Sequence, residues 1–332
     1  MKLATFAVPT PVGPVTRVGV VTNDGLIDIT AARTALLERR HPVATAIRLA
    51  TAQTPPDMIA LIGSGRCGLE WVSEAVDHAE GSGIERTSGG AALRYRHEEI
   101  VLLPPVPRPP AINCCTMWES HIRKSEARGG VVRWPEPGSV LRGYYKGNPD
   151  SVVAGGVELE YPPYADALDV ECEMAAVIGV GGRDLDGETA REAIFGYCIF
   201  NDVSVRSRQR EEMRLGLGPT KGKDHDGGNV LGPWLVTADE VGDPRALEMS
   251  LHVNGEEWSS YSSAEMAYSF PDVVAYLSQG QTLHPGHVVT SGSYPGGCGL
   301  DLGRALQPGD LVELRITRLG SLTNRLGRPA TA

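Results

Sequence analysis

The sequence predicts a β-rich α+β protein, and three features of the chain support this class. Its 332 residues are enough for a sizeable buried core, and by length they favour two domains over one. Glycine (40 residues) and proline (24 residues) are more numerous than a helical bundle needs, which favours strands joined by turns. Short apolar runs of strand length alternate with glycine-containing turns over most of the chain, and a few segments carry helix-capping signals.

The first hundred residues are predicted to form a compact α/β unit. It begins with three short strands, 3–8 (LATFAV), 17–22 (RVGVVT) and 25–30 (GLIDIT). Two helical stretches follow, from about Ala31 to Ala52 and from Pro56 to Ala79. Asp57 or Thr54 is expected to cap the second stretch, and the glycines at 63 and 65 are expected to interrupt it.

A proline-rich segment marks the expected domain boundary. Residues 102–112 (LLPPVPRPPAI) contain five prolines, so this segment cannot be an interior helix or a central strand. We therefore expect a small N-terminal domain over residues 1–104 and a larger domain over residues 105–332. The alternative is an extended segment within a single domain, and the sequence alone favours neither.

Strands and turns dominate the chain beyond this boundary. Residues 168–180 (LDVECEMAAVIGV) and 198–205 (CIFNDVSV) have the composition of strands. Residues 186–197 are predicted as a helix with an acidic start. A further helix is expected with Ser269 as its N-cap, Asp272 three residues later, and Gly280 as its stop.

Charge and cysteine content exclude several functional classes. The formal net charge of -10 argues against binding to nucleic acid or to an acidic membrane surface, because such binding depends on neutralising phosphates. A small anionic substrate stays compatible, since a metal ion or a few cations can dominate one site. The six cysteines include no CxxC pair and no zinc-finger spacing. With no secretory signal in MKLATFAVPT and no long apolar run, we expect a reduced, cytoplasmic protein.

Three carboxylates on two neighbouring strands form the candidate catalytic centre. Side chains alternate along a strand, so Glu171 and Glu173 share one face. The flanking residues are apolar, and burying two like charges without a partner is costly or forces protonation. Asp202, on the next apolar strand, is a third acid in similar surroundings. An all-oxygen set suits Mg²⁺, Mn²⁺ or Ca²⁺ rather than zinc, whereas the alternative is an exposed face whose glutamates are solvated or paired with arginine.

Several motifs occur in an order that resembles the fumarylacetoacetate hydrolase family over nearly all of residues 105–330. The matching stretches are WESH, YYKGNPDSVV, LDVECEMAAVIG, NDVSVRSRQ, GPTKGKD, LGPWLV, VTSGS and PGDLVELRITRLGSLTNRLG. The N-terminal hundred residues resemble the auxiliary domain of bacterial members of about this length. The resemblance implies a catalytic domain folded as a mixed β-sandwich roll, a small N-terminal α/β domain, and a homodimer.

The same resemblance implies a metal site. The family binds its metal through the two glutamates of E-x-E and the aspartate of the following N-D strand, which match Glu171, Glu173 and Asp202. The founding hydrolase also uses an upstream aspartate, whereas the corresponding region here is NCCTMWESH. Cys115 or a neighbour stands near that position. Either three carboxylates suffice, which we favour, or Glu119 substitutes.

His121 in WESH resembles the general base of the family. A histidine suits this role because its imidazole titrates near neutral pH. In smaller acylpyruvate-cleaving relatives, a glutamate three residues after the histidine is its partner. Here that position is Lys124, with Glu126 two residues further on. The sequence therefore leaves the partner of the histidine open, and with it the type of reaction.

Two lysines compete for one position of the family pattern. The family lysine stands three residues before an aspartate, and we expect Lys221 in GPTKGKD to match it, with Lys223 as the reserve candidate. Such a lysine can stabilise a developing oxyanion or enolate. The alternative for Lys221 is a solvated loop residue. His225 and Asp226 lie in the loop that follows; they could serve as extra metal ligands, but we expect this loop to be solvated.

Further residues match substrate-contacting positions of the family or recur at its spacing. They are Tyr145 in YYKGN, Arg206 and Gln209 in NDVSVRSRQ, and Ser293 in TSGS. Ser293 stands where threonine is usual, but it keeps a hydroxyl that can bind a substrate carboxylate.

Together these residues predict an enzyme that hydrolyses a C–C bond in a small dicarbonyl acid, such as a 2,4-dioxo acid or β-diketone, with Mg²⁺ (or Mn²⁺ or Ca²⁺) as cofactor. The same site can stabilise an enolate without hydrolysis, so the alternative is an isomerase of hydroxydienedioates or a decarboxylase of oxo acids. A non-catalytic relative that binds a metal or ligand is a third reading, and the joint presence of the acids, the histidine and the lysine argues against it.

Overall fold

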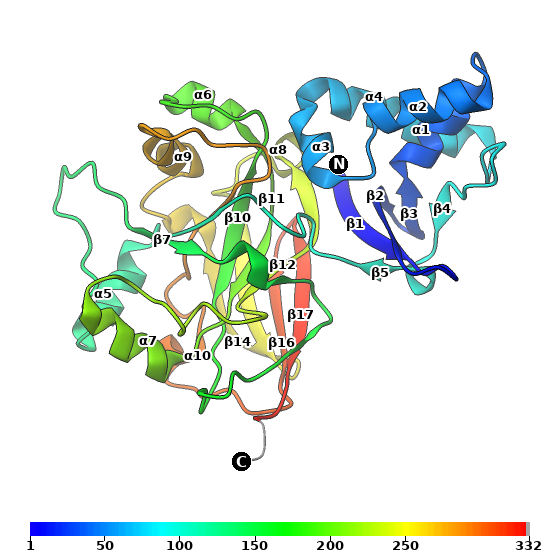
Figure 1. Cartoon of the computed structure of the whole chain (residues 1–332). Helices are drawn as coiled ribbons and strands as arrows, with labels where there is room; N and C mark the ends of the chain where they lie inside the picture. Colours follow the sequence, from blue (N-terminus) through cyan, green and yellow to red (C-terminus); the bar gives the residue numbers. More distant parts are fainter. Residues whose placement is uncertain (330–332) are drawn as a thin grey trace.

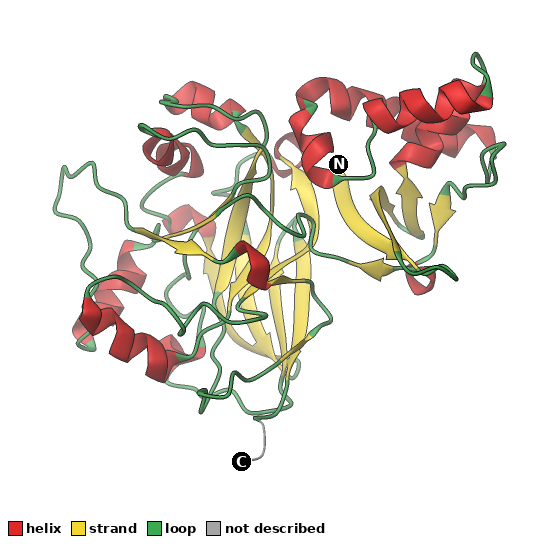
Figure 2. Cartoon of the chain, in the orientation of Figure 1, coloured by secondary structure: helices red, strands yellow, loops and turns green. Residues whose placement is uncertain are grey.

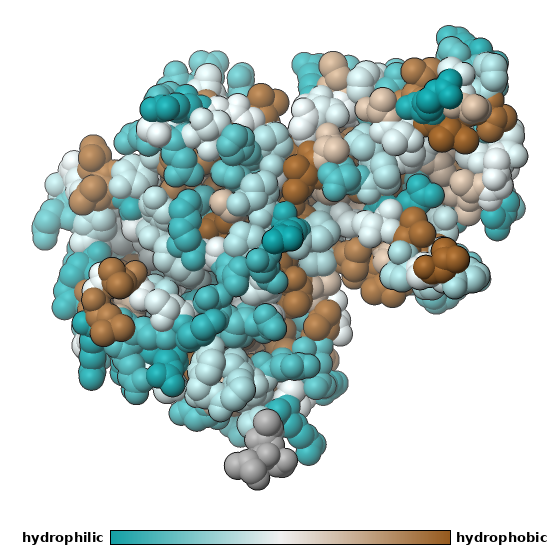
Figure 3. Space-filling model, in the orientation of Figure 1, coloured by the Kyte–Doolittle hydropathy of each residue, from teal (hydrophilic) through white to brown (hydrophobic). Residues whose placement is uncertain are grey.

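The computed structural model of the protein describes residues 1–329, so the last three residues of the expected second domain lie outside the described part. Strands form the centre of the molecule and the helices lie around them (Figure 2). On the face shown in Figure 3, hydrophobic residues occur in several separate groups on a largely hydrophilic surface. No helix within residues 1–329 is both long enough and apolar enough to cross a membrane.

A twelve-stranded mixed sheet runs through the described residues (Figure 1). Its main order is β4-β3-β2-β1-β12-β11-β10-β15-β6-β7, with β5 paired to β1 and β8 paired to β12. The β15–β6 and β12–β8 pairs are parallel and the others are antiparallel. The strands are Lys2–Val8 (β1), Val15–Thr22 (β2), Gly25–Asp28 (β3), Arg94–Tyr95 (β4), Val101–Leu102 (β5), Ile112–Cys115 (β6), Tyr144–Gly147 (β7), Val152–Val153 (β8), Cys172–Ile178 (β10), Ile194–Asp202 (β11), Asn229–Thr237 (β12) and Val288–Thr290 (β15).

A second, five-stranded sheet has the order β14-β13-β16-β17-β9. Its strands are Glu158–Leu159 (β9), Glu248–Val253 (β13), Glu256–Ser262 (β14), Leu311–Ile316 (β16) and Gly320–Leu326 (β17). The α-helices are Ile29–Glu38 (α1), Val43–Gln53 (α2), Met58–Gly63 (α3), Gly65–Ser82 (α4), Glu119–Ala127 (α5), Gly187–Glu192 (α6), Arg206–Glu212 (α7), Ala238–Val241 (α8), Phe270–Ser278 (α9) and Gly299–Leu302 (α10). The two sheets and the helices around them confirm the predicted β-rich α+β class.

The larger hydrophobic core lies between the two sheets. Alternate residues of β10, among them Met174 and Ala176, are fully buried in it together with Leu251 of β13 and Leu314 of β16. Complete burial of one such leucine stabilises the fold by about 1.5–3 kcal/mol. The opposite face of β10 points away from this core, and the acidic residues lie on that face.

That opposite face packs against the N-terminal helices farther along the strands. Val177 of β10 and Phe200 of β11 belong to a second hydrophobic cluster with Leu61 and Ile62 of α3. The apolar end of the face is thus covered by the N-terminal unit, whereas the acids occupy its other end. The fold in this way places the acidic side chains on a partly covered face of the large sheet.

The N-terminal strands join the same large sheet as the rest of the chain. In β1, Lys2 pairs with Val236 of β12 and Leu3 pairs with Leu235. The proline-rich segment connects β5 to β6 and contains no helix or strand between residues 103 and 111. The division of the chain at residue 104 stays a prediction.

One predicted helix is wrong as a single element. The expected helix from Ala31 to Ala52 is two helices, α1 and α2, separated by residues 39–42. Pro42 is the residue before α2, and a proline cannot continue the helix that precedes it. The expected interruption near Gly63 is confirmed, since α3 ends there and α4 begins at Gly65.

The predicted helix caps are confirmed, although one helix is shorter than expected. Asp57 caps α3 by accepting the backbone N–H of Ala60 at 2.7 Å. Ser269 and Asp272 form a reciprocal capping box at the start of α9. The helix expected over residues 186–197 ends at Glu192, because the apolar residues after it belong to β11.

Candidate active site and metal centre

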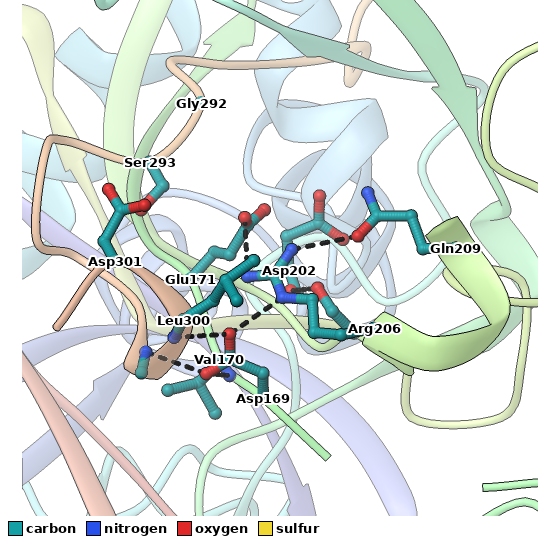
Figure 4. A network of polar contacts seen from close by, with 12 residues as sticks. Asp169, Val170, Glu171, Asp202, Arg206, Gln209, Gly292, Ser293, Leu300 and Asp301 are labelled. Atoms are coloured by element: carbon teal, nitrogen blue, oxygen red, sulfur yellow. Dashed lines mark hydrogen bonds and ion pairs between the residues drawn. The ribbon is translucent and has the colours of Figure 1, made fainter. Parts of the chain in front are cut away.

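The register between β10 and β11 brings the three expected metal ligands together. Glu173 pairs with Phe200, so Glu171 lies opposite Asp202, whose backbone N–H donates to the Glu171 carbonyl oxygen at 3.3 Å. The side chains of Glu171 and Glu173 leave the same face because the two residues are two positions apart. One carboxylate oxygen of each of the three acids lies within 4.8 Å of the others. Figure 4 shows Glu171 and Asp202 side by side.

The three carboxylates have very different electrostatic surroundings. Burial raises the pKa of Glu173 well above its ordinary value, and the charges of Asp202 and Glu171 raise it further. Burial also raises the pKa of Asp202, although Lys223 opposes this shift. Burial acts in the same direction on Glu171, but Arg206 and Lys223 outweigh it and lower the pKa of Glu171 to about 2. The cluster therefore disfavours three simultaneous negative charges unless a further cation is present.

The arrangement is suited to a divalent cation. Oδ1 of Asp202 is buried and has no hydrogen-bond partner among the described residues, which is a costly state for a carboxylate oxygen. When all three carboxylates are ionised, their negative charges exceed the positive charges of Lys223 and Arg206 by one. A divalent cation would give Asp202 its missing partner and make the centre attractive to an anionic substrate. A set of hard oxygen donors suits Mg²⁺ or Mn²⁺.

Lys223 reaches the carboxylates and Lys221 does not. The Nζ of Lys223 lies 2.8 Å from Oε2 of Glu171 and 2.9 Å from Oδ2 of Asp202, and its side chain is only 4% exposed. The side chain of Lys221 is 61% exposed, and its Nζ donates to the backbone carbonyl oxygen of Asp224 at 3.0 Å. The structure thus corrects the expectation for Lys221, which is a loop residue outside the cluster.

The loop after Lys223 is only partly solvated. Asp226 is exposed as expected, but His225 is buried, with 8% of its surface exposed. Burial lowers the pKa of His225, which favours the neutral imidazole. The expectation that this histidine is a solvated loop residue is therefore wrong.

His121 has a carboxylate partner that the sequence did not reveal. Its Nδ1 lies 2.8 Å from Oδ2 of Asp301, a residue of α10 that is 180 positions away in the chain. Burial opposes ionisation of Asp301, but His121 and Arg128 outweigh it and hold the pKa of this carboxyl well below its usual range. An ionised carboxylate can only accept, so Nδ1 of His121 carries the hydrogen and Nε2 is left for proton transfer.

Neither residue considered from the sequence is the partner of His121. Glu126 accepts the backbone N–H of Trp134 at 3.1 Å and forms an ion pair with Arg123. Lys124 is exposed at the surface of α5. Only a signal that links residues far apart in the sequence could have identified Asp301.

The start of α5 is tied to the acidic cluster. The indole Nε1 of Trp118, the N-cap residue of α5, donates to the carbonyl oxygen of Gly292 at 2.9 Å. The N–H of Gly292 in turn donates to Oε2 of Glu173 at 3.0 Å. These two hydrogen bonds connect the N-terminus of α5 to Glu173 through Gly292. The helix that carries His121 therefore begins next to the expected metal ligands.

Arg206 connects two of the expected site residues. It is the first residue of α7, and its Nη2 donates to Oε1 of Glu171 at 2.8 Å (Figure 4). Its Nη1 donates to Oε1 of Gln209 at 3.0 Å, one turn later in the same helix. This contact occupies the amide oxygen of Gln209, and the amide nitrogen has no acceptor within residues 1–329, so it can donate to a ligand.

Asp169 is a further residue of this network, and sequence reasoning did not single it out. Its Oδ2 accepts from Nε of Arg206 at 2.8 Å. It also accepts the backbone N–H groups of Gly299, at 2.8 Å, and Leu300, at 3.2 Å, where α10 begins. Asp169 and Arg206 thus link the acidic cluster to the helix that carries Asp301.

Tyr145 and Ser293 lie at different edges of the site. The hydroxyl of Tyr145 donates to Oδ2 of Asp202 at 2.6 Å, and burial raises the pKa of this phenol well above its ordinary value. Ser293 is buried, its hydroxyl donates to the backbone carbonyl oxygen of Tyr294 at 3.3 Å, and it lies beside Asp301 in Figure 4. Tyr145 is therefore engaged with an expected metal ligand, whereas Ser293 lies on the side of the histidine pair.

Strand β6 lies in the region where the family's upstream aspartate is missing, and it carries Cys114 near the acidic cluster. Burial raises the pKa of the Cys114 thiol well above its ordinary value, and the charges of Asp202 and Glu173 raise it further. The thiol therefore lies near the acids in its protonated form. Glu119 does not replace the aspartate, because its half-exposed side chain forms an ion pair with Arg123 on the surface of α5.

Comparisons with known proteins are consistent with this geometry. A protein of Burkholderia multivorans is 38% identical over 164 residues, which are 49% of this chain and 57% of that protein. The match thus spans little more than half the length of this relative. The oxaloacetate tautomerase YisK of Bacillus subtilis is 29% identical over 238 residues, which are 71% of this chain and 76% of that protein.

A solved structure resembles the whole chain. The maleylpyruvate hydrolase from Sphingobium sp. SYK-6, in complex with manganese (II) ion and pyruvate, superposes with a TM-score of 0.68. The two chains are 25% identical, and the match covers 99% of this chain and 100% of that one. Residues 118–327 also match the sequence profile described as Fumarylacetoacetate (FAA) hydrolase C-terminal. The chain therefore belongs to the fumarylacetoacetate hydrolase family.

Proposed function

We propose that the protein is a divalent-metal-dependent hydrolase that cleaves a C–C bond in a 2,4-dioxo acid of the acylpyruvate type. The observation that carries this proposal is the pairing of His121 with Asp301 beside the acidic cluster. A hydrolase needs a base that activates water, whereas decarboxylation to an enolate needs none. A tautomerase also uses a base, to take a proton from C3, so it is distinguished from the hydrolase by its products. The similar maleylpyruvate hydrolase was solved with Mn²⁺ and pyruvate, and pyruvate is one product of the reaction proposed here.

Glu171, Glu173 and Asp202 would hold the metal ion. When bound, Mg²⁺ or Mn²⁺ supplies a Lewis acid that polarises the carboxylate and 2-oxo oxygens of the substrate. Lys223 forms ion pairs with two of these acids, Glu171 and Asp202. Its positive charge partly neutralises the site and so reduces the repulsion of the substrate carboxylate. Its three nearest acceptors are all protein oxygens, so it contributes charge rather than a free hydrogen-bond donor.

His121 is the proposed general base. Asp301 holds Nδ1–H and favours the imidazolium that forms when Nε2 takes a proton from water. The resulting hydroxide adds to the distal carbonyl carbon, C4, and the amide nitrogen of Gln209 donates to the oxygen that becomes negative. The C3–C4 bond then breaks, its electron pair stays on C3, and C3 takes up a proton. One dioxo acid and one water thus give pyruvate and a carboxylic acid.

A tautomerase or decarboxylase is the second candidate function. The oxaloacetate tautomerase of Bacillus subtilis covers more of this chain than the Burkholderia relative does. A tautomerase needs the same stabilisation of an enolate but adds no water to the substrate. Product analysis distinguishes the candidates, because tautomerisation leaves the carbon skeleton intact and decarboxylation releases CO₂.

The direct test is loss of enol absorbance for a panel of acylpyruvates and oxaloacetate, with Mg²⁺ or Mn²⁺ and with a chelator. We expect cleavage that requires the metal and that is lost in Glu173→Gln, with Glu188→Gln as an exposed control. Metal-bound protein that leaves every acylpyruvate carbon chain intact would overturn the hydrolase proposal, and conversion of oxaloacetate alone would favour the tautomerase.

We also propose that the enzyme is a cytoplasmic homodimer. The six free cysteines agree with a reducing compartment, and the family resemblance implies the dimer. Light scattering coupled to gel filtration measures the oligomeric state, and a monomeric mass at micromolar concentration would contradict the dimer.

A further inference from the structure

A buried glutamate at the end of α7, Glu212, has no part in the chemistry proposed above. It is 7% exposed, and it forms no ion pair with a lysine or arginine of the described chain. Instead its Oε2 accepts two backbone N–H groups, from Thr220 at 2.9 Å and from Gly222 at 3.0 Å. A carboxylate that accepts two backbone donors forms charge-assisted hydrogen bonds, which are stronger than neutral ones.

The carboxylate of Glu212 is maintained in its ionised form. Burial alone would raise its pKa, but the N–H groups of Gly222 and Thr220 outweigh this effect and lower it. The side chain therefore accepts both hydrogen bonds throughout the neutral range. It acts as a fixed anchor for the backbone of the 220–223 turn.

Gly222 is held from both sides. Its N–H donates to Glu212, and its carbonyl oxygen accepts the N–H of Val205, just before α7, at 2.8 Å. A Cβ placed on Gly222 would lie 2.7 Å from the backbone nitrogen of Gln209, which is closer than real Cβ atoms approach. The turn therefore lies directly on α7, and glycine is required at this position.

Lys223 follows Gly222 and projects from the same turn. Its backbone N–H, like that of Asp224, donates to the carbonyl oxygen of Thr220, at 2.9 and 2.7 Å. Thr220 and Gly222, the two residues bound by Glu212, thus fix the backbone that directs the Lys223 side chain. That side chain ends between Glu171 and Asp202.

We propose that Glu212 is a positioning residue, which holds the 220–223 turn so that Lys223 stays inserted between the metal-binding carboxylates. Both ends of α7 then contribute to the site: its first residue, Arg206, binds Glu171, and its last residue, Glu212, holds the turn that carries Lys223. The effect on Lys223 follows from geometry alone. The effect on turnover rests on the proposed function.

The adjacent glutamate provides a matched control. Glu211 has the same charge and helix, but its side chain is 69% exposed and pairs with Arg208. Lys221 provides an internal reference within the same loop, because it is exposed and outside the cluster. Glu212 and Glu211 are thus a buried and an exposed glutamate side by side, and Lys223 and Lys221 are a buried and an exposed lysine in one loop.

The experiment is acetylation of native protein with acetic anhydride, followed by mass spectrometry of the peptides that contain the two lysines. In the wild type, Lys221 should react at least about tenfold faster than Lys223, whose Nζ is buried and paired. Glu212→Ala should raise the rate at Lys223 several-fold and leave Lys221 unchanged, while Glu211→Ala changes neither. Glu212→Gln keeps an acceptor oxygen and should restore most of the protection.

Continued protection of Lys223 in folded Glu212→Ala would overturn the proposal. If that variant does not fold, Glu212→Asp is used instead, because it shortens the side chain by one methylene and moves the carboxylate away from the turn. Unchanged protection of Lys223 in Glu212→Asp would also overturn the proposal. In an acylpyruvate assay, kcat should fall about tenfold to a hundredfold in Glu212→Ala with a small change in KM, because the charge of Lys223 is misplaced. An inactive wild type would count against the proposed function only, whereas equal activity of wild type and Glu212→Ala would count against the role of Glu212.

Discussion

Two lysines separated by one glycine lie in very different surroundings. Lys223 is buried between two carboxylates, whereas Lys221 is exposed and bonded to a loop carbonyl. We expect Lys223→Met to lower kcat/KM by about a hundredfold or more, because it removes a buried positive charge from an acidic centre. Lys221→Met should stay within about twofold of the wild type, as surface substitutions usually do. Steady-state kinetics of both variants test the assignment, and equal losses would refute it.

The pair of His121 and Asp301 gives a second prediction for single residues. Asp301→Asn should lower kcat by about 10²- to 10⁴-fold, because the asparagine no longer favours the imidazolium of His121. Mn²⁺ affinity should change little, since neither residue belongs to the three-carboxylate cluster. Glu126→Gln is the control, and its activity should match the wild type. Kinetics combined with calorimetric Mn²⁺ titration checks both statements, and an active Asp301→Asn would contradict the role of the pair.

Part of the site could be predicted from local sequence. The alternation of side chains in a strand placed Glu171 and Glu173 on one face, and Asp202 lies opposite Glu171 in the structure. The choice between the lysines could not be made in this way, because both stand three residues before an aspartate. Asp301 could not be found either, since a contact across 180 residues leaves no local pattern.

At the level of secondary structure, the capping box of α9 allows a stability prediction. Ser269 accepts the N–H of Asp272, and Asp272 accepts the N–H of Ser269. Ser269→Ala should lower the free energy of unfolding by about 1 kcal/mol, because it leaves a helical N–H without its acceptor. Ser260→Ala, at an exposed strand position, should change it by less than about 0.5 kcal/mol. Urea unfolding measures both, and equal effects would contradict the capping role.

Helix boundaries show which elements could be predicted. The end of α3 was predictable because glycines weaken a helix, and the caps of α3 and α9 were predictable from side-chain chemistry. The break between α1 and α2 was also predictable, because Pro42 cannot continue the helix that precedes it. The end of α6 was not visible, because residues 194–197 become a strand through pairing with distant partners.

For the whole molecule, we expect the acidic cluster to make stability depend on pH and on metal binding. Burial and the charges of Asp202 and Glu171 raise the pKa of Glu173 in the folded protein above its value in the unfolded chain. In the window between these two values the folded state keeps a proton that the unfolded state has lost. The free energy of unfolding of metal-free protein therefore falls as pH rises through this window.

Metal binding should reverse this loss, because it requires ionised carboxylates and its affinity rises with pH. Mn²⁺ at about a hundred times its Kd should add about 2.7 kcal/mol to the free energy of unfolding. The increase in Tm on adding Mn²⁺ should be larger at about pH 8 than at about pH 5.5. Glu173→Gln should remove most of this increase. Calorimetry at both pH values measures it, and an increase independent of pH would contradict the coupling to the cluster.

The overall architecture was easier to predict than its connections. Glycine and proline content, strand-length apolar runs and ordered motifs indicated a β-rich α+β protein of this family, and the fold agrees. The pairing of β1 with β12 was not predictable, because it joins residues more than two hundred positions apart. Long-range pairing depends on the complete fold rather than on any segment of it.

Isotope tracing shows whether water cleaves a C–C bond at this site. An acylpyruvate is incubated with the Mn²⁺-loaded enzyme in ¹⁸O-labelled water, and the products are identified by mass spectrometry. We expect equal amounts of pyruvate and of the carboxylic acid that contains the former C4, with ¹⁸O in the carboxyl group of that acid. We expect no reaction after chelation. Substrate recovered only as its keto and enol forms, from protein that still binds Mn²⁺, would contradict it.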